Sequence, residues 1–558
     1  MSFEYLTKDF IFDHTAFEQI KEEAPSYYIF PTVYIIYCKK TKKAYIGETT
    51  NILNRLSQHL KNSDKNQLKN VKVIFSPYFN KSSVLDIESN LIQNMLADKQ
   101  FQLLNGNEGI SNHHYYQKTE YAHTFKDIWK NLQFEKLVKH DLLDIQNSDL
   151  FKYSPYKSLS EDQYQAIREY LFILNGATDK TSTFIQGSAG TGKTILAVYL
   201  VKLLLSDIDE EDLEDNFEVS PLIELAQEVR TKLKKEKDEI KIALVVPMTS
   251  LRKTLQNVFK SIHGLSKSMV IGPNEVKNDY YDLLIVDEAH RLKRRKNITG
   301  YAEFDKTNRH FGLDENGNEL DWIMMSSNNQ LFFYDEKQSI RPTDIEKEKF
   351  KAIKDTKNTI VLKSQMRVQG GEDYIEFVDR LLTDSTDLKP WQSSNYELKL
   401  FTSMPQMIKE LEDKEKEHGL CRTISGYSWK WLSAKNDVPD VTIDGVDLHW
   451  NRTSQDWINS AKQMTEMGCI HTTQGYDLNY SGIIFGIDIT YNEETKKIEV
   501  IKENYFDRNG KVGITDEQLH NYIINIYKTI MYRGIKGTYV YCCDENLRKY
   551  FKNYIPIG

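Results

Sequence analysis

An apolar strand, a glycine-rich loop and an apolar helix follow one another in residues 183–198, and this order constrains the fold more than any other feature of the chain. The loop, residues 187–194, reads GSAGTGKT. Its backbone N–H groups can turn inward because three positions are glycine, Gly187, Gly190 and Gly192. The positive end of the following helix dipole also favours an anion. The segment therefore predicts an ATP site in which Lys193 contacts the β- and γ-phosphates and Thr194 ligates Mg²⁺.

A carboxylate pair closes another apolar run further along the chain. Residues 281–286 read YDLLIV, and Asp287 and Glu288 follow directly. Acidic residues after a strand are also common as helix N-caps, so the pair alone leaves both interpretations open. The phosphate loop upstream favours the ATPase interpretation. In that interpretation Asp287 holds Mg²⁺ through water, and Glu288 polarises the water that attacks the γ-phosphate.

Short β-branched or aromatic runs recur beyond residue 155, each bounded by turn or polar residues and separated by helical stretches. They occupy residues 184–185, 242–246, 283–286, 331–334, 360–362, 483–485 and 538–542. This alternation predicts an α/β fold with parallel sheets built from βαβ units. Upstream, we expect strands at 33–38 and 71–75 and helices at 52–60 and 84–96, which form a small mixed α/β domain.

Length, cysteine content and net charge limit the classes of protein to which the chain can belong. At about 100 to 200 residues per domain, a chain of 558 residues predicts about three or four domains. Five scattered cysteines fit neither a disulfide framework nor a zinc site. No apolar run is long enough for a membrane span and the start lacks the layout of a signal peptide, so we expect a cytoplasmic protein without a membrane partner. The net charge of −8 means that nucleic acid would need a local basic groove.

The same pass along the chain predicts its domain boundaries. Two charged interruptions, 207–215 and 291–318, are expected as solvated insertions. Residues 113–155 are polar and aromatic and predict a helical connector. We therefore expect five parts: an N-terminal extension (1–27), the small α/β domain (28–112), the connector (113–155), an ATP-binding lobe (156–345) and a second lobe (346–558).

Motifs on either side of the phosphate loop occur in the order found in superfamily 1 helicases, and this resemblance covers about residues 156–558. It implies two RecA-like lobes with ATP between them. Gln163, in LSEDQ, would read the adenine edge, and residues 245–250, VVPMTS, would touch the nucleic-acid backbone. Gln338, in FFYDEKQ, would respond to the γ-phosphate.

The second half of the chain carries two arginines in matching motifs. Arg367, in LKSQMR, and Arg533, in KTIMYRG, fit the two arginine positions of this superfamily, which supply charge across the cleft. Residues 468–477, GCIHTTQGYD, resemble the motif that couples the second lobe to ATP and nucleic acid, so Gln474 and Gly475 would bind the nucleotide. Together these motifs are most similar to Schlafen-type helicase domains.

The N-terminal domain has a polar helix face and an acidic residue among apolar neighbours. Asn51, Arg55 and His59 are four residues apart and share one face, while leucines and isoleucine take the other. Glu88 lies at helical distances from apolar residues, which places its carboxylate on an apolar face. Because an unpartnered buried carboxylate is costly, Glu88 is expected to be protonated, paired or bound to a cation. The alternative is a side chain at the edge of that face, which reaches water or pairs with Arg55.

The segments TVY (32–34) and YIG (45–47) resemble the two strand motifs of GIY-YIG nucleases, and the residues above, with Asn105, continue the pattern. The resemblance implies that Glu88 holds one Mg²⁺, or Mn²⁺ as the alternative ion, against the scissile phosphate. Arg55 would neutralise charge that develops on the phosphate. Tyr34 or Tyr45 would position or deprotonate the attacking water, and His59 would assist.

The sequence thus predicts an ATP-dependent DNA helicase or translocase fused to a metal-dependent endonuclease. DNA is preferred on family grounds, and RNA stays open because no residue reports on a 2′-hydroxyl. Defence against bacteriophage and DNA repair are both compatible settings. Two alternatives stay open as well: an ATP-regulated DNA-binding or remodelling protein whose nuclease domain is inactive, and an RNA-directed motor.

Overall fold

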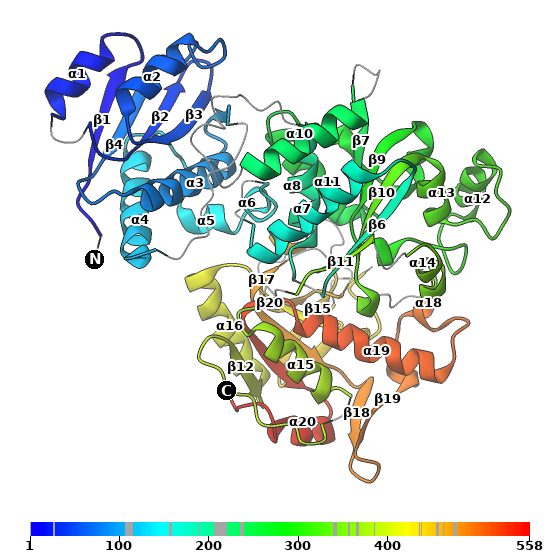
Figure 1. Cartoon of the computed structure of the whole chain (residues 1–558). Coiled ribbons are helices and arrows are strands. Elements are labelled where there is room, and N and C mark those ends of the chain that lie inside the picture. Colours follow the sequence, from blue (N-terminus) through cyan, green and yellow to red (C-terminus); the bar gives the residue numbers. More distant parts are fainter. Residues whose placement is uncertain are drawn as a thin grey trace. The chain divides into compact units, whose positions relative to one another are not determined.

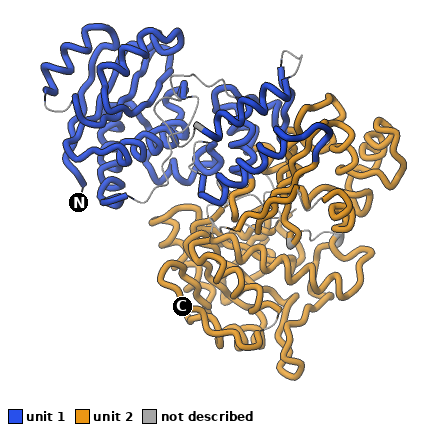
Figure 2. Tube along the Cα trace, viewed as in Figure 1, with its two compact units in different colours: residues 1–181, 194–244, 254–270 blue, residues 182–193, 245–253, 271–558 orange. Residues whose placement is uncertain are grey.

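The computed structural model divides into two compact units, residues 1–181, 194–244 and 254–270 in one, and 182–193, 245–253 and 271–558 in the other (Figure 2). It describes residues 2–558 except 26–27, 106–114, 156–158, 189, 206–219, 235–238, 339–342, 355–357, 364–367, 384, 435, 437, 453–456, 461–462, 471 and 474–476. Three predicted site residues, Arg367, Gln474 and Gly475, lie outside the described residues, as does the charged interruption 207–215.

The N-terminal domain is built on one five-stranded sheet with the order β1-β4-β2-β3-β5 (Figure 1). Its strands are β1 (Leu6–Ile11), β2 (Thr32–Cys38), β3 (Lys43–Thr49), β4 (Asn70–Phe75) and β5 (Gln102–Leu103). Strands β2 and β3 form an antiparallel hairpin, and β4 pairs antiparallel with both β2 and β1. The expected strands 33–38 and 71–75 are confirmed, and β1 adds residues of the expected N-terminal extension to the sheet.

Helices of this domain follow from the apolar spacing that predicted them. They are α1 (Ala16–Glu23), α2 (Ile52–Lys61) and α3 (Lys81–Asp98). Asn51 caps α2 by accepting a hydrogen bond from the Asn54 N–H at 3.2 Å, and Asn80 and Ser83 form a capping box at the start of α3. Downstream lie α4 (Lys118–Phe134), α5 (Leu142–Gln146) and α6 (Asp149–Lys152), within the residues assigned to the connector.

The ATP-binding motifs lie on a sheet with the strand order β11-β6-β10-β9-β7-β8. Strands β9 and β10 run parallel, as do β6 and β11. The strands are β6 (Thr181–Gln186), β7 (Ile242–Val245), β8 (Val270–Ile271), β9 (Tyr281–Val286), β10 (Ser327–Tyr334) and β11 (Thr359–Val361). Its longer helices are α7 (Glu161–Gly176), α8 (Lys193–Leu205), α10 (Ser220–Lys234) and α11 (Thr249–Ser261).

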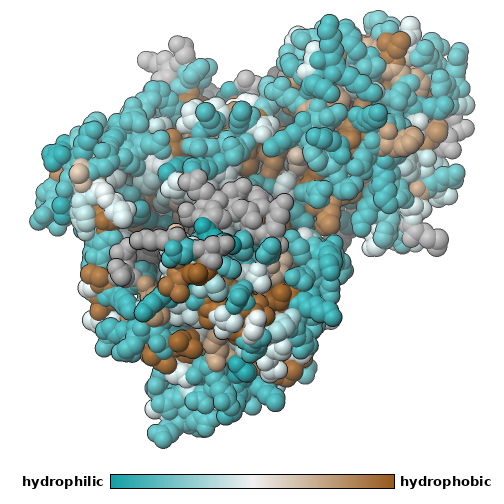
Figure 3. Space-filling model, turned by 180° about the vertical axis from the view of Figure 1, so that it is seen from behind, coloured by the Kyte–Doolittle hydropathy of each residue, from teal (hydrophilic) through white to brown (hydrophobic). Residues whose placement is uncertain are grey.

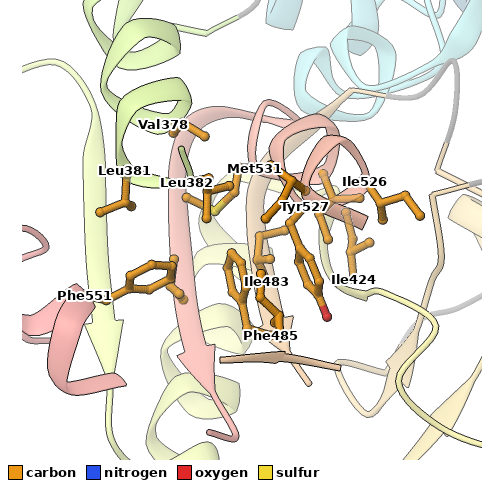
Figure 4. Packing of buried hydrophobic residues seen from close by; sticks show 14 of the residues in the cluster. Val378, Leu381, Leu382, Ile424, Ile483, Phe485, Ile526, Tyr527, Met531 and Phe551 are labelled. Carbon is orange, nitrogen blue, oxygen red and sulfur yellow. The ribbon is translucent and has the colours of Figure 1, made fainter. Parts of the chain in front are cut away.

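A second parallel sheet has the order β12-β20-β17-β13. Its strands are β12 (Glu397–Phe401), β13 (Cys421–Ser425), β17 (Leu478–Phe485) and β20 (Gly534–Cys542), and its main helices are α15 (Gly371–Leu381), α16 (Met404–His418), α19 (Asp516–Met531) and α20 (Glu545–Lys552). Apolar side chains of α15, α19 and α20 pack on β17 in a continuous core (Figure 4). The predicted fold class, a small mixed α/β domain followed by two RecA-like parallel-sheet lobes, is confirmed.

Two small sheets and an insertion complete the described structure. The small sheets are β14 (Val441–Ile443), β15 (Val446–Trp450) and β16 (Glu466–Met467), and the hairpin β18 (Ile489–Asn492) with β19 (Lys497–Val500). The insertion between β9 and β10 contains α12 (Tyr301–His310) and α13 (Glu319–Met325). Hydrophilic residues dominate the face drawn in Figure 3, with apolar patches between them. Among the described residues, no helix has the length and apolar character needed to cross a membrane.

Candidate nucleotide and nuclease sites

The phosphate loop leaves strand β6 and enters helix α8 through two left-handed glycines. Gly190 has φ 89° and Gly192 has φ 83°, a region that glycine adopts without a Cβ clash. A Cβ on Gly187 would lie 2.4 Å from the Thr191 hydroxyl oxygen. The loop therefore requires glycine at each of these three positions, two of them because of φ and one because of space.

Lys193 is the first residue of α8, and its ammonium group is held inside the loop. Its side chain is 5% exposed, and Nζ donates to the carbonyl oxygens of Gly187 at 2.7 Å and Ser188 at 2.8 Å. The Asp335 carboxylate lies 3.9 Å away. A cation oriented by backbone carbonyls at the mouth of a glycine loop has the chemistry that triphosphate oxygens require, so the residues present fit ATP. Thr194 follows Lys193 as the second residue of α8.

Asp335 connects two residues that are far apart in the sequence. It follows strand β10, next to Lys193, and its Oδ2 accepts a hydrogen bond from Gln338 Nε2 at 2.6 Å. All three side chains are less than 9% exposed. The structure thus brings the predicted sensor Gln338 and the predicted phosphate-binding Lys193 to one carboxylate. The sequence analysis did not assign Asp335, although its place three residues before Gln338 was a usable signal.

The acidic pair after strand β9 has an unusual backbone. Asp287 is fully buried, and its carboxylate accepts a hydrogen bond from the Glu288 N–H at 3.0 Å. Glu288 adopts φ 51° and ψ 44°, the left-handed region that costs a residue with a Cβ about 1–3 kcal/mol and is concentrated at functional sites. This conformation excludes Glu288 as an ordinary helix N-cap, and its side chain makes no capping hydrogen bond.

His290 is the partner of Glu288 and was not assigned from the sequence. Its Nε2 lies 3.0 Å from Glu288 Oε2, and the imidazole is fully buried. Burial raises the pKa of the Glu288 carboxyl, but the charges of His290, Lys193 and Arg291 outweigh it and hold that pKa well below its usual range. Glu288 is therefore ionised near neutral pH, which is the state that can accept a hydrogen bond from water.

Gln163 and Arg533, two further residues predicted to contact the nucleotide, both make hydrogen bonds with nearby backbone. The Gln163 side chain takes part in a capping box at the start of α7: its Oε1 accepts from the Ser160 N–H at 3.1 Å, and its own N–H donates to the Ser160 hydroxyl. Arg533 lies between α19 and β20 and is 4% exposed, and its carbonyl accepts a hydrogen bond from the Leu478 N–H at 3.1 Å. The adenine and arginine-finger roles of these residues stay predictions.

In the N-terminal domain, the hairpin β2–β3 and helix α2 bring three predicted side chains together. The Tyr34 hydroxyl and His59 Nε2 are 2.8 Å apart, and the Tyr45 ring lies edge-on to His59 with a centroid distance of 4.9 Å. Gly47 lies across from Tyr34 in the hairpin, and a Cβ there would stand 2.2 Å from the Tyr34 hydroxyl. The glycine of the second strand motif therefore makes room for the tyrosine of the first.

The remaining predicted residues of this domain are placed by α2, α3 and the end of the sheet. Arg55 is 6% exposed and donates to Gln58 Oε1 at 3.2 Å, and Glu88 on α3 is 8% exposed. Asn105 both donates to the Ile46 carbonyl and accepts from the Ile46 N–H, so its amide extends the edge of β3. Glu88 is buried as its apolar surroundings predicted.

Lys65 is a buried cation that the motif did not include. Its side chain is 3% exposed, and Nζ lies 4.1 Å from the centroid of the Tyr45 ring. Burial, with smaller contributions from Lys65 and Arg55, lowers the pKa of His59 to about 2, so this imidazole is neutral near pH 7. Neutral His59 can share a hydrogen bond with the Tyr34 hydroxyl, but it does not take up a proton near neutral pH. No periodicity or motif in the sequence indicated Lys65.

The donor set for a metal in the nuclease domain is small. Among the residues that the structure describes, no group of three or more His, Cys, Asp or Glu side chains could hold a metal ion. Mg²⁺ is commonly bound through one or two carboxylates and keeps several waters, so Glu88 alone fits an ion that also contacts substrate phosphate. The Glu48 carboxylate is committed to an ion pair with Lys81.

Two family models match the segments that contain these candidate sites. The glycine loop with its lysine, the carboxylate pair and the parallel sheets are the features of a P-loop ATPase, and the second domain brings Tyr34, Tyr45 and His59 together. Residues 180–544 match the model described as "Schlafen group 3, DNA/RNA helicase domain", and residues 30–101 match the GIY-YIG catalytic domain. Because the first match covers more than half of the chain, the protein belongs to the Schlafen group 3 helicase family. It is an enzyme that joins a helicase-type ATPase to a GIY-YIG nuclease domain.

Individual relatives are distant. An uncharacterized protein of Saccharomyces cerevisiae, YPL245W, is 26% identical over 345 residues, which cover 55% of this chain and 73% of that protein. Among solved structures, Mss116p bound to single-stranded RNA and AMP-PNP aligns over 76% of both chains at 13% identity with a TM-score of 0.30. A DEAD box protein from Methanococcus jannaschii aligns over 71% of this chain and 94% of that one, at 14% identity with a TM-score of 0.20. Scores this low carry no argument about function.

Proposed function

We propose that this protein is an ATP-driven DNA helicase or translocase whose N-terminal domain cuts DNA by hydrolysing phosphodiester bonds. The observation that carries the proposal is the contact path from Lys193 through Asp335 to Gln338, which lies beside the phosphate loop. A γ-phosphate bound to Lys193 competes with Asp335 for the same ammonium group. Hydrolysis then changes the partner of Asp335, and Gln338 is directly bonded to that carboxylate.

In this proposal each predicted nucleotide residue has one task. Asp287 and Thr194 would hold Mg²⁺, and ionised Glu288 orients and polarises the attacking water with His290 behind it. Gln163 would read adenine through its side-chain amide. Arg367 and Arg533 supply positive charge at the phosphates, and the residues of the second lobe's coupling motif, Gln474 and Gly475, contact the nucleotide.

The nuclease residues are proposed to act on one phosphodiester. Glu88 would hold a Mg²⁺ or Mn²⁺ ion, which when bound supplies Lewis-acid chemistry at the scissile phosphate. Arg55 neutralises negative charge on the phosphate, and Tyr34 or Tyr45 positions the attacking water. Neutral His59, 2.8 Å from the Tyr34 hydroxyl, would hold that hydroxyl in position through a hydrogen bond.

The domain division is part of the proposal. We assign residues 28–112 to the nuclease domain after an extension of residues 1–27, and residues 113–155 to the connector. The two lobes of the motor are residues 156–345 and 346–558.

The test is a cleavage assay on supercoiled, linear and single-stranded DNA, with Mg²⁺ or Mn²⁺ and with or without ATP. Metal-dependent nicking that is lost in Glu88→Gln supports the nuclease. Asp86→Asn is the matched control, because it removes another carboxylate from the same helix, one that accepts from the Tyr115 hydroxyl at 2.8 Å. ATP hydrolysis measured in parallel with single-stranded DNA and RNA tests the motor, and no stimulation by either polymer would contradict it.

A second candidate function is an ATP-regulated DNA-binding or remodelling protein with an inactive nuclease domain. It is favoured by the burial of the candidate nuclease residues: Tyr34, Tyr45, Arg55, His59 and Glu88 are each less than 9% exposed. If the parent protein binds DNA and hydrolyses ATP but nicks no substrate with either metal, this candidate replaces the first. Stronger ATPase stimulation by RNA than by DNA would instead indicate an RNA-directed motor.

The biological setting follows from the pairing of a cutter with a motor. Such a pair can degrade DNA processively after one entry event, which suits both the removal of invading phage DNA and the processing of damaged DNA. Plating efficiency of phages on cells with the parent protein or with Lys193→Ala separates these settings, because only a defence system lowers plaque number through ATP hydrolysis.

A further inference from the structure

A strongly basic stretch directly follows the carboxylate pair of the ATPase site. Residues 293–310 contain six Lys or Arg and only two Asp or Glu, in a chain whose net charge is −8. Four of these cations are consecutive, in the sequence KRRKNITGY at 293–301, which we call the basic segment. The sequence alone predicted a solvated insertion here. In the structure this loop carries a specific distribution of free and committed charge.

Two of the four consecutive cations are committed to carboxylates. Arg294 pairs with Glu346, and Arg295 binds both oxygens of Asp305, at 2.6 and 3.0 Å. Lys293 and Lys296, by contrast, form no ion pair with any residue that the structure describes, and both are partly exposed. The basic segment therefore presents two ammonium groups that are available to an anion.

An exposed aromatic ring lies at the end of the same segment. Tyr301 is 40% exposed, and the Arg295 guanidinium is 5.0 Å from its ring centroid. Asp305 holds the same guanidinium through two hydrogen bonds, which keeps this cation beside the ring. A tyrosine held beside cations is the combination that binds single-stranded nucleic acid, where the bases stack and the phosphates meet the charges.

The backbone of the basic segment is anchored at several points. Lys293 pairs with Asp344 in an antiparallel bridge, and its N–H donates to Glu319 Oε2 at 2.7 Å. The Arg294 N–H donates to the Thr343 carbonyl at 2.9 Å, and Asn297 Nδ2 donates to the Val512 carbonyl at 2.8 Å. A charged loop that served only solubility would not need these contacts, and an ordered loop loses less entropy when it binds.

The anchored segment connects directly to the catalytic carboxylate. The Arg291 N–H donates to the Glu288 carbonyl at 2.8 Å, and the Arg291 guanidinium lies 3.4 Å from Asp344 in a fully buried ion pair. Asp344 is the residue that faces Lys293 across the bridge. The backbone bridge and the Arg291–Asp344 ion pair together form a path of contacts from Lys293 to the left-handed turn at Glu288.

We propose that the basic segment is a contact surface for single-stranded nucleic acid, with Lys293 and Lys296 on successive phosphates and Tyr301 stacked on a base, and that its occupancy sets the ATPase rate through Arg291. This inference rests on the motor function proposed above and names the surface by which nucleic acid stimulates it. The chemistry recognised is a polyanion with exposed bases, which single-stranded DNA and single-stranded RNA share.

The test uses the full-length protein and fluorescein-labelled oligo(dT) and oligo(U). In Lys293→Gln/Lys296→Gln, the slope of log affinity against log salt concentration should fall by about 1.4, since each phosphate contact on a single strand contributes about 0.7. Basal ATP hydrolysis should stay at the parent level, and its stimulation by the oligonucleotide should fall at least fivefold. Lys496→Gln/Lys497→Gln, at the exposed end of the turn and the first position of β19, removes the same charge and should behave as the parent.

The stacking contact has its own pair of variants. Tyr301→Phe keeps the ring and should bind as the parent does, whereas Tyr301→Ala should bind on the order of tenfold more weakly with an unchanged salt slope. If Tyr301→Ala bound the oligonucleotide as tightly as the parent does, the Tyr301 ring would not be part of the contact surface. If both double variants lowered the salt-dependence slope equally, Lys293 and Lys296 would contribute only nonspecific charge, and the inference would fail.

Failure of the motor and failure of the surface give different results. A parent protein that neither binds nor is stimulated by either oligonucleotide contradicts the proposed motor. A parent that is stimulated, with a Lys293→Gln/Lys296→Gln variant that is stimulated equally, contradicts only the basic segment. Comparison of oligo(dT) with oligo(U) identifies the natural polymer, because the surface itself contacts features that both share.

Discussion

Asp488 gives the sharpest stability prediction, because it is a fully buried carboxyl group with incomplete hydrogen bonding. It follows strand β17, and its Oδ1 accepts from the Ser428 hydroxyl at 2.5 Å and the Tyr527 hydroxyl at 2.7 Å. Its Oδ2 is buried and makes no hydrogen bond with any described residue. Burial raises the pKa of Asp488 to about 6, even though the two hydroxyl groups act to lower it.

The sign of the pH effect follows from the direction of this shift. The folded-state pKa, about 6, lies above the reference value of 3.8, so the folded state binds the proton more tightly than the unfolded chain does. The favourable contribution is fully present below about pH 4 and is lost as the pH rises through 6. A difference of about two pKa units corresponds to about 3 kcal/mol at pH 8, at 1.36 kcal/mol per unit.

Asp488→Asn removes this penalty while it keeps the size of the side chain and an oxygen that accepts from Ser428 and Tyr527. We expect the variant to be more stable than the parent at pH 8 by about 1–3 kcal/mol, and this difference to shrink as the pH falls and to disappear only below about pH 4. For a lobe of this size that corresponds to a rise in midpoint of about 2–10 °C at pH 8. The assay is thermal unfolding by near-ultraviolet circular dichroism from pH 3.5 to 8. A variant as stable as the parent at every pH would refute a raised pKa of the buried Asp488 carboxyl, and Glu545→Gln, on the exposed face of α20, is the control for loss of one negative charge.

Three further predictions test other parts of the molecule. Lys193→Ala should reduce ATP hydrolysis by at least a hundredfold in a phosphate-release assay, while metal-dependent nicking persists. Gly47→Ala places a Cβ 2.2 Å from the buried Tyr34 hydroxyl, so it should lower the free energy of unfolding of the nuclease domain by about 1–3 kcal/mol and abolish nicking, with ATPase unchanged. The Lys72 side chain is 1% exposed, and its ammonium group lies 2.5 Å from the Asp9 carboxylate and 2.6 Å from that of Glu135. Lys72→Met should lower the free energy of unfolding in urea by about 1–3 kcal/mol, and an unchanged urea midpoint would contradict this.

Much of the candidate ATP site could be predicted because its residues are close in sequence. The candidate site depends on glycines in residues 187–192, on the lysine after them and on the carboxylate pair after an apolar strand. Each of these acts through local backbone geometry, which requires a recognisable spacing in the sequence. The same holds for Arg55 and His59, four residues apart on one helix turn. The partners of these residues could not be predicted in this way. Asp335 meets Lys193, and Lys65 meets Tyr45, only after strands and loops have packed.

The sequence by itself determined the order of the strands and helices, the glycines that a left-handed loop demands and the two families to which the segments are similar, because these depend on residue type and short-range spacing. Only the tertiary structure decided which charges are neutralised and which stay available. Arg294 and Arg295 look the same as Lys293 and Lys296 in the sequence, yet Arg294 pairs with Glu346 from a distant segment and Arg295 with Asp305 of the neighbouring helix, while neither lysine forms an ion pair with a described residue. The physical reason is that electrostatic pairing depends on distance in space, which chain folding sets and sequence proximity does not.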